Sequence, residues 1–436
     1  MRKGFIFTYD LCVACNSCAA ACRLENSDKM PLRRIYAGFP LIYPGLPAHN
    51  ISMACNHCQD PVCLKSCPAG AYSVHLDTGA ITLNDKLCIG CNYCFWNCPF
   101  DAPVYNDKRR KIEKCDFCIG RQEEGIEPAC SSACPTGALR FDLLNNANEP
   151  EDETFRIEKN TAFSSLDPSL ETIIPAITQA HPVIIPEPAP IDNYKPVLRS
   201  GSKIKAVSEW SLILFSVLSS HLFALNFSSW NSGVSLSSNL YLSLVLITGL
   251  VSLLHLGKPL KSFLALRNIK SSPLSMEIAG FCMFSLSSVA AWIFAENWIW
   301  IISFISGLVF LYLIDSVYTF VDKRVLIRIH PGQVFAAGLM IASYYSSELL
   351  AFGFIALLRI ILISFHIREK INNKWLTRAL IIYIFIIVSA VIHLIIMSEP
   401  ELLFIILVAL SELGIRTIYY IDLSPVSIGK LLYQKK

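Results

Sequence analysis

The sequence predicts an α+β domain followed by an all-α, polytopic membrane domain of about eight transmembrane helices, and three observations favour this fold class. Sixteen of the seventeen cysteines lie within the first 134 residues of the 436-residue chain. Long apolar stretches alternate with short polar ones from about residue 206 onward, and the mean hydropathy of the chain is +0.47. Prolines at positions 182, 186, 188, 190 and 196 separate the two halves, so we expect residues 186–205 to form an extended, semi-rigid tether.

The cysteines form four runs whose spacing is typical of iron–sulfur ligands. The runs are Cys12, Cys15, Cys18, Cys22; Cys55, Cys58, Cys63, Cys67; Cys88, Cys91, Cys94, Cys98; and Cys115, Cys118, Cys130, Cys134. Three of the four runs end in Cys-Pro, as the bacterial ferredoxin run does. Sixteen thiolates in groups of four supply the ligands of four [4Fe–4S] clusters. We therefore expect residues 1–185 to form a double-ferredoxin domain that moves single electrons.

Two alternatives for the cysteines are less compatible with their spacing. Zinc sites use paired Cys-x2-Cys knuckles with a longer spacer, often with histidine, whereas three or four of these cysteines lie within about a dozen residues. A disulfide framework belongs to small secreted domains. Short strands are expected at residues 79–83 and 137–142, between and after the runs. In two-cluster ferredoxins the last cysteine of one run binds the other cluster, so crossed ligands are expected here.

The second half predicts a membrane domain at residues 206–421, with eight helices near the ~20 apolar residues that cross a bilayer. The expected helices are residues 207–227, 238–256, 275–295, 298–320, 331–346, 348–366, 377–397 and 402–421. The fifth and sixth are short and separated only by Ser346 and Ser347, so they also fit one long apolar region.

The loop charges predict the orientation of these helices. Seventeen lysines and arginines lie on one set of loops and ends, including the basic tail at residues 422–436, and none lies in the loops of the other side. The positive-inside rule then places both termini, and the cysteine-rich domain, on the cytoplasmic face of a bacterial inner membrane. Because the positive charges follow the membrane loops, the net charge of +3 gives no reason to expect nucleic-acid binding. No nucleotide-binding, nicotinamide or flavin motif is present.

The motifs resemble a known family. The first ~190 residues are similar to the electron-transfer subunit of the dimethyl-sulfoxide reductase group of molybdopterin oxidoreductases. The matching stretches are residues 55–63, 88–94, 114–118 and 134–138. The second half resembles the separate quinol-oxidising anchor subunit of these enzymes, through residues 208–212, 254–259, 272–278, 317–318 and 412–420. The chain departs from the family in fusing the two subunits.

The resemblance implies which runs share clusters. The first run pairs with the fourth, and the second with the third. The implied ligand sets are Cys12, Cys15, Cys18 with Cys134; Cys115, Cys118, Cys130 with Cys22; Cys55, Cys58, Cys63 with Cys98; and Cys88, Cys91, Cys94 with Cys67. Some relatives replace one cysteine of the third run and hold a three-iron cluster, but this sequence keeps all four.

Ionisable residues within membrane spans are costly and usually functional. Those of this chain are Glu209, His255, Glu277, Asp315, Arg359, Glu412 and Arg416. Oxidation of a quinol needs a proton acceptor near each hydroxyl, and His255 and Glu277 are the expected catalytic acceptors. Glu209 and Arg416 lie toward the same, positively charged side, so Glu209, His255, Glu277 and Arg416 are the expected quinol-binding residues.

Each of these residues also has a structural interpretation. His255 could bond the free carbonyls at a helix end, and Glu277 could complement the dipole of the helix that it opens. Glu412 and Arg416, four residues apart, fit a plain ion pair. Cys282 is expected to be a small buried apolar residue, and His57 a neighbour of a cluster rather than a ligand.

Taken together, these features predict a subunit that oxidises menaquinol from the quinone pool of the bilayer and passes electrons to a separate molybdopterin catalytic subunit. It would be half of an enzyme, with no molybdenum site of its own. Three alternatives stay open: the reverse flow from a dehydrogenase to quinone, a polysulfide or nitrate reductase module, and a structural anchor with vestigial clusters. A b-haem bound by two of His221, His255 and His393 is not expected, because no pair among them is obvious.

Overall fold

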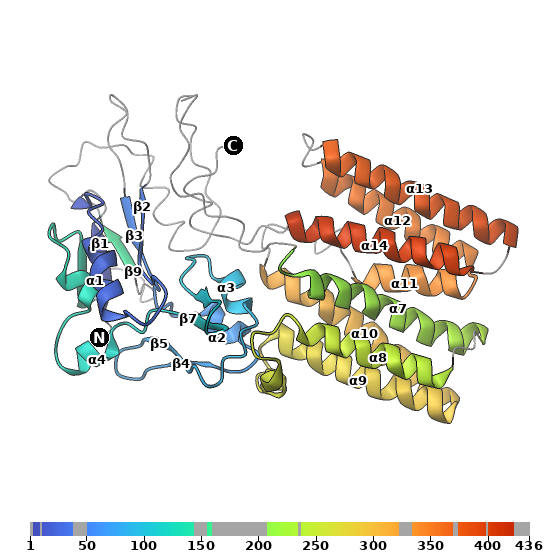
Figure 1. Ribbon diagram of the computed structural model, residues 1–436, viewed down its shortest axis with the longest axis horizontal. Helices are drawn as coiled ribbons and strands as arrows, with labels where there is room; N and C mark the ends of the chain where they lie inside the picture. The colour runs from blue at the N-terminus through green and yellow to red at the C-terminus, as the bar shows by residue number, and fades with distance from the viewer. Residues whose placement is uncertain are drawn as a thin grey trace. The chain divides into compact units, whose positions relative to one another are not determined.

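In the computed structural model, the chain divides into two compact units, the second of which is Ile204–Ser424. The structure describes residues 3–8, 11–37, 50–143, 155–158, 207–233, 237–321, 334–368, 374–397 and 400–422. Figure 1 shows both units, coloured along the chain. The predicted tether at residues 186–205 lies outside the described residues, and so does the predicted tail, apart from Asp422.

The described part of unit 1 contains four small sheets. In the largest, β1 (Lys3–Thr8) is the central strand, antiparallel to β8 (Leu139–Leu143) and parallel to β9 (Phe155–Glu158). The others are two-stranded and antiparallel: β2 (Arg34–Ala37) with β3 (Asn50–Met53), β4 (Tyr72–Val74) with β5 (Ile81–Leu83), and β6 (Val104–Asn106) with β7 (Lys111–Glu113). The strands expected at residues 79–83 and 137–142 are confirmed as β5 and β8.

Short helices carry or directly follow cysteines of the four runs. They are α1 (Ser17–Glu25), α2 (Val62–Ser66), α3 (Tyr93–Asn97), α4 (Ile119–Glu123) and α5 (Ala129–Ser132). Helix α1, from the first run, packs against α5 from the fourth, and α2 from the second run packs against α3 from the third. The runs therefore meet in two pairs.

Cysteines are part of the hydrophobic core of unit 1. Phe5, Phe117 and Phe141 form a cluster of edge-to-face rings with centroids 5.0–5.4 Å apart. Around these rings the same core includes buried cysteines from the first and fourth runs, such as Cys18 and Cys130. Because the strands and helices are so short, the surroundings of the cysteines make up much of what holds this unit together.

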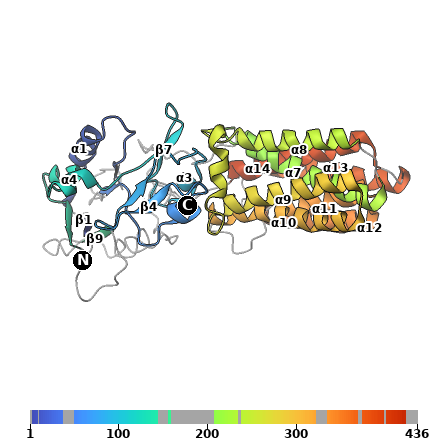
Figure 2. The ribbon, with the colours of Figure 1, turned by 90° about the horizontal axis from the view of Figure 1, so that it is seen from below.

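The described residues of unit 2 form eight α-helices and one 3₁₀ helix, η3 (Pro259–Leu266). The α-helices are α7 (Trp210–Ser232), α8 (Ser238–Leu253), α9 (Pro273–Phe294), α10 (Asn297–Val321), α11 (Val334–Tyr345), α12 (Leu349–Arg368), α13 (Lys374–Met397) and α14 (Leu402–Asp422). Figures 1 and 2 show them packed side by side along a common direction. Helix α7 packs against α8, α10, α11 and α14 and is the most buried of the long apolar helices.

Local sequence signals explain where these helices begin and end. Ser237 and Ser272 are N-caps whose side-chain oxygens accept the backbone N–H of Leu240 and Ser275, each at 3.4 Å. Gly233 ends α7 in the left-handed region, with φ of 66°. Ser347, with φ of 59°, lies in the turn that separates α11 from α12. The expected fifth and sixth helices are therefore two separate helices.

The prediction of an α+β first half and an all-helical second half is confirmed. Within the described residues, five helical segments are long and apolar enough to cross a membrane: Trp210–Ser232, Pro273–Phe294, Asn297–Tyr318, Arg378–Met397 and Leu402–Ile421. Three further apolar segments, Ser238–Leu253, Val334–Tyr345 and Leu349–Ser364, are shorter. A membrane-spanning region is thus supported, while eight complete spans stay a prediction.

Candidate functional site

The first and fourth cysteine runs meet at what we call site I. One small cavity is lined by Cys12, Cys15, Cys18 and Cys134, together with apolar side chains that include Phe7, Ile35 and Leu139. The hydroxyl oxygen of Ser52 lies 3.3 Å from Cys18 Sγ, and the backbone N–H of Leu139 donates to Cys134 Sγ at 3.4 Å. Four thiols from distant parts of the sequence thus surround one space with hydrogen-bond donors close by.

The remaining member of the first run, Cys22, lies with three cysteines of the fourth run. We call this group site II: Cys22, Cys115, Cys118 and Cys130. Burial raises the pKa of Cys22 to about 11. The positive charge of Arg33 lowers this pKa, whereas the charges of Cys130 and Cys118 raise it further. Such thiols are neutral near pH 7, so iron that binds them must displace their protons.

The second and third runs form the other two groups. Site III is Cys55, Cys58 and Cys63 with Cys98, and site IV is Cys88, Cys91 and Cys94 with Cys67. Burial, reinforced by the charges of Cys55 and Cys98, raises the pKa of Cys58 to about 12. The four cysteines of site IV line one small cavity, and the backbone N–H of Ala71 donates to Cys67 Sγ at 3.3 Å.

The loops between the first two cysteines of each run share one backbone conformation. The second residue after the first cysteine has a positive φ in all four runs: Ala14 at 52°, His57 at 49°, Gly90 at 71° and Phe117 at 70°. Only one of these is glycine, and strained residues of this kind gather at functional sites. In the second and fourth runs the same residue donates its backbone N–H to the first cysteine, at 3.5 Å to Cys55 Sγ and 3.4 Å to Cys115 Sγ.

These features fit iron–sulfur clusters. Sites I and IV each offer four thiols around one cavity. A backbone N–H group bonds a sulfur in each of the four sites, as in cluster sites whose potentials such bonds adjust. Among the described residues, no three His, Cys, Asp or Glu side chains are arranged to hold a single metal ion. When bound, such a cluster accepts and donates one electron at a time; the protein itself supplies the ligands, the N–H donors and the exclusion of water.

His57 lies at the junction of the two pairs of runs. Its side chain is fully buried, and its Nδ1 accepts the backbone N–H of Ile81 at 2.9 Å. The centroid of its ring also lies 4.2 Å from that of Phe117, from the fourth run, with the ring planes at 33° to each other. The expectation that His57 is a structural neighbour rather than a ligand agrees with these contacts.

Comparison with known proteins identifies the class and the family. A 4Fe-4S dicluster domain matches residues 48–144, so the first half is an iron–sulfur electron-transfer domain. The B subunit of anaerobic dimethyl sulfoxide reductase from Haemophilus influenzae is 37% identical over 151 residues, which are 32% of this chain and 73% of that protein. The chain therefore belongs to the family of iron–sulfur subunits that includes this relative.

Two further relatives support the same assignment. The B subunit of the Escherichia coli dimethyl sulfoxide reductase is 37% identical over 150 residues, again 32% of this chain and 73% of the relative. The iron–sulfur subunit of E. coli formate dehydrogenase-O is 45% identical over 87 residues, 20% of this chain and 29% of that protein. The predicted resemblance of the cysteine-rich half is confirmed.

In unit 2, two of the predicted quinol-binding residues lie in one buried polar cluster. Glu277 in α9 is 7% exposed, and Asp315 in α10 is its charged neighbour. Tyr318 interacts electrostatically with the charges of Glu277, Arg416 and Asp315. Its hydroxyl forms a hydrogen bond with that of Tyr420. Side chains from α9, α10 and α14 therefore meet at this point.

Asp315 has a structural role of its own. Its carboxylate oxygens accept the backbone N–H groups of Val334 at 2.8 Å and Phe335 at 3.0 Å, the first two residues of α11. A carboxylate at this position satisfies donors that no residue within the helix can reach, and it complements the helix dipole. Asp315 thus ties α10 to the start of α11.

Glu412 in α14 is fully buried and pairs with Arg359 in α12. The two terminal guanidinium nitrogens of Arg359 donate to the two carboxylate oxygens of Glu412, and the bond from Nη2 to Oε2 is 2.9 Å long. Tyr383 in α13 donates to the same carboxylate at 3.2 Å. Arg416 is 4.0 Å from Glu412 and donates to Ser220 Oγ in α7 at 2.9 Å. The predicted pair of Glu412 and Arg416 exists, but Arg359 is the closer partner of Glu412.

The other two predicted quinol-binding residues lie apart from this cluster. His255 follows the end of α8, and its Nδ1 is buried with no hydrogen-bond partner among the described residues. Glu209 is the N-cap residue of α7 and accepts a hydrogen bond from Ser208 at 3.2 Å. In the described part of the chain, no hydrogen bond or ion pair joins either residue to Glu277 or Arg416.

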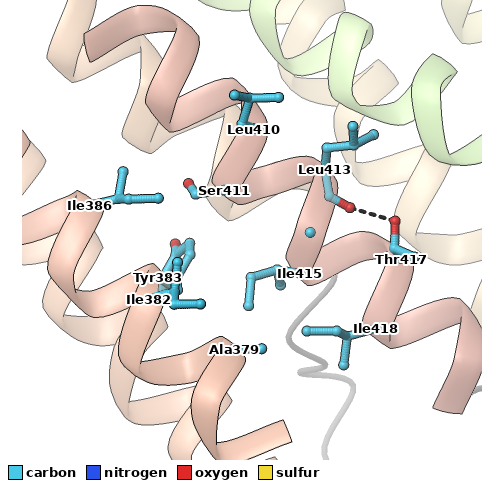
Figure 3. A pocket seen from close by; sticks show the side chains of 11 residues that line it. Ala379, Ile382, Tyr383, Ile386, Leu410, Ser411, Leu413, Ile415, Thr417 and Ile418 are labelled. Atoms are coloured by element: carbon cyan, nitrogen blue, oxygen red, sulfur yellow. Dashed lines mark hydrogen bonds between the residues drawn. The ribbon is translucent and has the colours of Figure 1, made fainter. Parts of the chain in front are cut away.

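Unit 2 also contains a pocket away from these residues. It has a volume of about 460 Å³ and lies between α13 and α14, and none of the predicted quinol-binding residues lines it. Figure 3 shows that its walls are mainly aliphatic, with Ile382, Ile386, Leu410 and Ile415. Tyr383, which bonds Glu412, is also part of the lining.

Two other expectations concern single residues. Cys282 is exposed on α9, so the expectation that it is buried was wrong. The side chain points away from the bundle, where an apolar span contacts lipid rather than other helices. His221 Nδ1 lies 2.7 Å from the hydroxyl of Tyr345, and His393 Nδ1 lies 3.4 Å from that of Tyr344.

Sequence reasoning missed several residues of these sites. Arg33 and Lys114 are buried among the cysteines, at 3% and 5% exposure. Both lie in a charge-rich half of the chain, where a lone cation gives no signal of burial. Tyr318, Tyr383 and Tyr420 look like ordinary apolar residues of a membrane helix. The Arg359–Glu412 pair had a signal, since opposite charges in two apolar helices tend to pair.

Proposed function

We propose that this protein oxidises menaquinol in a bacterial inner membrane and passes electrons singly through four [4Fe–4S] clusters to a separate molybdopterin catalytic subunit. The observation that carries the proposal is the grouping of all sixteen cysteines of the four runs into sites I to IV. The relatives add support, because their names describe a component of dimethyl sulfoxide reductase and a subunit of formate dehydrogenase.

The membrane part of the proposal rests on unit 2. We propose that its eight helices all span the bilayer, with sites I to IV on the cytoplasmic face. Glu277 is buried at the start of α9 beside Asp315 and Tyr318, and we propose that it accepts a proton from a quinol hydroxyl. His255 is the proposed second acceptor, because its Nδ1 is buried with no hydrogen-bond partner among the described residues. Glu209 and Arg416 complete the proposed quinol-binding set.

The reverse direction is the second candidate. The similarity of residues in the cysteine-rich half to the formate dehydrogenase-O subunit, at 45% identity, favours it specifically. In that case electrons would pass from a partner dehydrogenase through the same sites to quinone. A polysulfide or nitrate reductase module would use the present direction with another catalytic partner.

Purification of the membrane complex tests the proposal. Iron analysis should give four clusters per chain, and the co-purifying large subunit should contain molybdenum. A reduced menaquinol analogue should then reduce the clusters in the absence of the catalytic substrate. Clusters that stay oxidised with quinol, but become reduced with formate or another donor of the large subunit, would favour the reverse direction.

A further inference from the structure

Two buried cations in unit 1 lie between neighbouring cysteine sites. Lys114 follows β7 directly and is 5% exposed, and Arg33 precedes β2 and is 3% exposed. Lysine and arginine are rarely buried unless a negative charge compensates them. No salt bridge to a carboxylate is found for either residue within the described part of unit 1, where the other cations that form ion pairs are more exposed.

The hydrogen bonds of Lys114 hold its charge at one point. Its ammonium donates to the carbonyl oxygen of Cys115 at 2.7 Å and to that of Ile81. Burial disfavours the charged form of Lys114, and negative charge on Cys55, Cys115 and Cys63 favours it. Cys55 and Cys115 themselves pack in one buried cluster. Cys115 belongs to site II, whereas Cys55 and Cys63 belong to site III. Lys114 therefore faces two sites at once.

Arg33 repeats this arrangement one site further on. Its guanidinium donates to Ser52 Oγ at 2.9 Å, and that hydroxyl lies 3.3 Å from Cys18 of site I. Burial again opposes the charge, and negative charge on Cys130, Cys18 and Cys115 favours it. Cys130 and Cys115 belong to site II. Sites I and II thus share Arg33, as sites II and III share Lys114.

We propose that Arg33 and Lys114 are the shared countercharges that set the reduction potentials of neighbouring clusters. The inference rests on the proposed function, since it requires clusters at sites I to III. A cluster with four thiolates is net negative and gains one further negative charge when it accepts an electron. A nearby buried cation stabilises the reduced form more than the oxidised form, because little solvent screens it. Each residue then raises the potential of both sites that it faces.

The role follows from the one-electron balance of the transfer. When an electron moves from one site to the next, the first loses one negative charge and the second gains it, and no proton need move. A cation that both sites share stabilises the electron on either side. It therefore raises both potentials without favouring one direction, so these are positioning charges and not catalytic residues.

The test is a redox titration of the full-length, membrane-bound protein, followed by EPR, with signals assigned through cysteine variants. In Lys114→Met, sites II and III should both shift to lower potential and site IV should not. We expect at least a tenfold change in the ratio of reduced to oxidised cluster, which is about 59 mV for a one-electron couple. Arg33→Gln should shift sites I and II instead. The matched control is Lys65→Met, since Lys65 also lies within two residues of a cluster cysteine, Cys63 of site III, but is 53% exposed and paired with Asp60.

Each outcome decides the question. Unchanged potentials in Lys114→Met, or an equal shift of all four centres, would overturn the inference. If Lys114→Met loses clusters, Lys114→Arg distinguishes charge from shape. Recovery of the clusters at parental potentials supports the countercharge, whereas loss in both variants shows a requirement for shape alone and overturns it. A parent protein that lacks clusters at sites I to III would instead contradict the proposed function.

Discussion

At the scale of single residues, the last cysteine of each run decides which site the run completes. Cys98 ends the third run but interacts electrostatically with Cys58 and Cys63 of the second. Cys67 ends the second run but lines the cavity of the third run. Each run thus contributes its first three cysteines to one site and its fourth to the site of the partner run. The cysteine spacing predicts the ligands, but it does not by itself say which run is the partner.

The variants Cys98→Ser and Cys67→Ser test this exchange. Cys98→Ser should perturb or convert the cluster of site III and leave that of site IV, because serine replaces one of the four ligands of site III. Cys67→Ser should do the reverse. EPR of the reduced protein distinguishes the signals, and Cys282→Ser serves as a control, because Cys282 is exposed on α9. Loss of the site IV signal in Cys98→Ser would contradict the crossed pairing.

Glu277 and His255 are the residues on which the proposed quinol chemistry depends. Glu277→Gln and His255→Gln should each lower the rate of quinol-dependent cluster reduction by about 10²-fold or more, because a proton acceptor is lost. The EPR signals of all four clusters should persist after chemical reduction. Glu348→Gln is the matched control, since Glu348 is exposed at the turn before α12. A parental rate in both variants would remove the proposed site.

At the scale of elements, glycines set how closely the membrane helices approach each other. A Cβ atom added at Gly307 in α10 would lie 2.6 Å from the ring of Phe223 in α7 and 3.0 Å from that of Phe284 in α9. At Gly353 in α12 an added Cβ would meet nothing within 4 Å. Small residues at such contacts let helix backbones pack closely in membranes.

The pair Gly307→Ala and Gly353→Ala therefore gives opposite expectations. Gly307→Ala should lower the free energy of unfolding of the detergent-solubilised protein by about 1–3 kcal/mol, because two aromatic rings must move. Gly353→Ala should leave it unchanged or raise it by up to about 1 kcal/mol, since alanine favours helix. Thermal unfolding followed by circular dichroism measures both. Equal stability of the two variants would show that α10 does not pack as described.

The helix boundaries illustrate what local sequence decides. The expected third helix, residues 275–295, begins within two residues of α9, which starts at Pro273 after the N-cap Ser272. The length of α11 was not predictable in the same way. Its first two N–H groups bond Asp315, 19 and 20 residues earlier in the sequence, and that contact exists only in the folded bundle.

At the scale of the whole molecule, the two units should respond differently to removal of iron. Chelation should unfold unit 1, because its strands are short and buried cysteines such as Cys18 belong to its core. Unit 2 contains no cysteine of the four runs and should keep its helices. Limited proteolysis with circular dichroism checks this, with the untreated protein in the same detergent as the control. A unit 1 that resists protease after chelation would contradict the prediction.

The orientation in the membrane can be tested on the intact cell. The seventeen-to-none distribution of lysine and arginine predicts that residues 199–205 lie on the cytoplasmic face. An impermeant amine reagent should therefore fail to modify Lys203 and Lys205 in spheroplasts and should modify them in inverted vesicles. Modification from outside would reverse the predicted topology. With quinol protons released and consumed on one side, turnover should build little membrane potential.

The sequence by itself determined which kind of domain each half forms. Cysteine spacing predicts cluster ligands because ligation needs particular atoms at short separations, and apolar length predicts membrane helices because the bilayer has a definite thickness. Only the tertiary structure decided which charges meet. Arg33 and Lys114 lie between cysteine sites, and Arg359 pairs with Glu412, through contacts between segments far apart in the sequence. Such contacts depend on the packing of whole elements, and they cannot be predicted from a local pattern of residues.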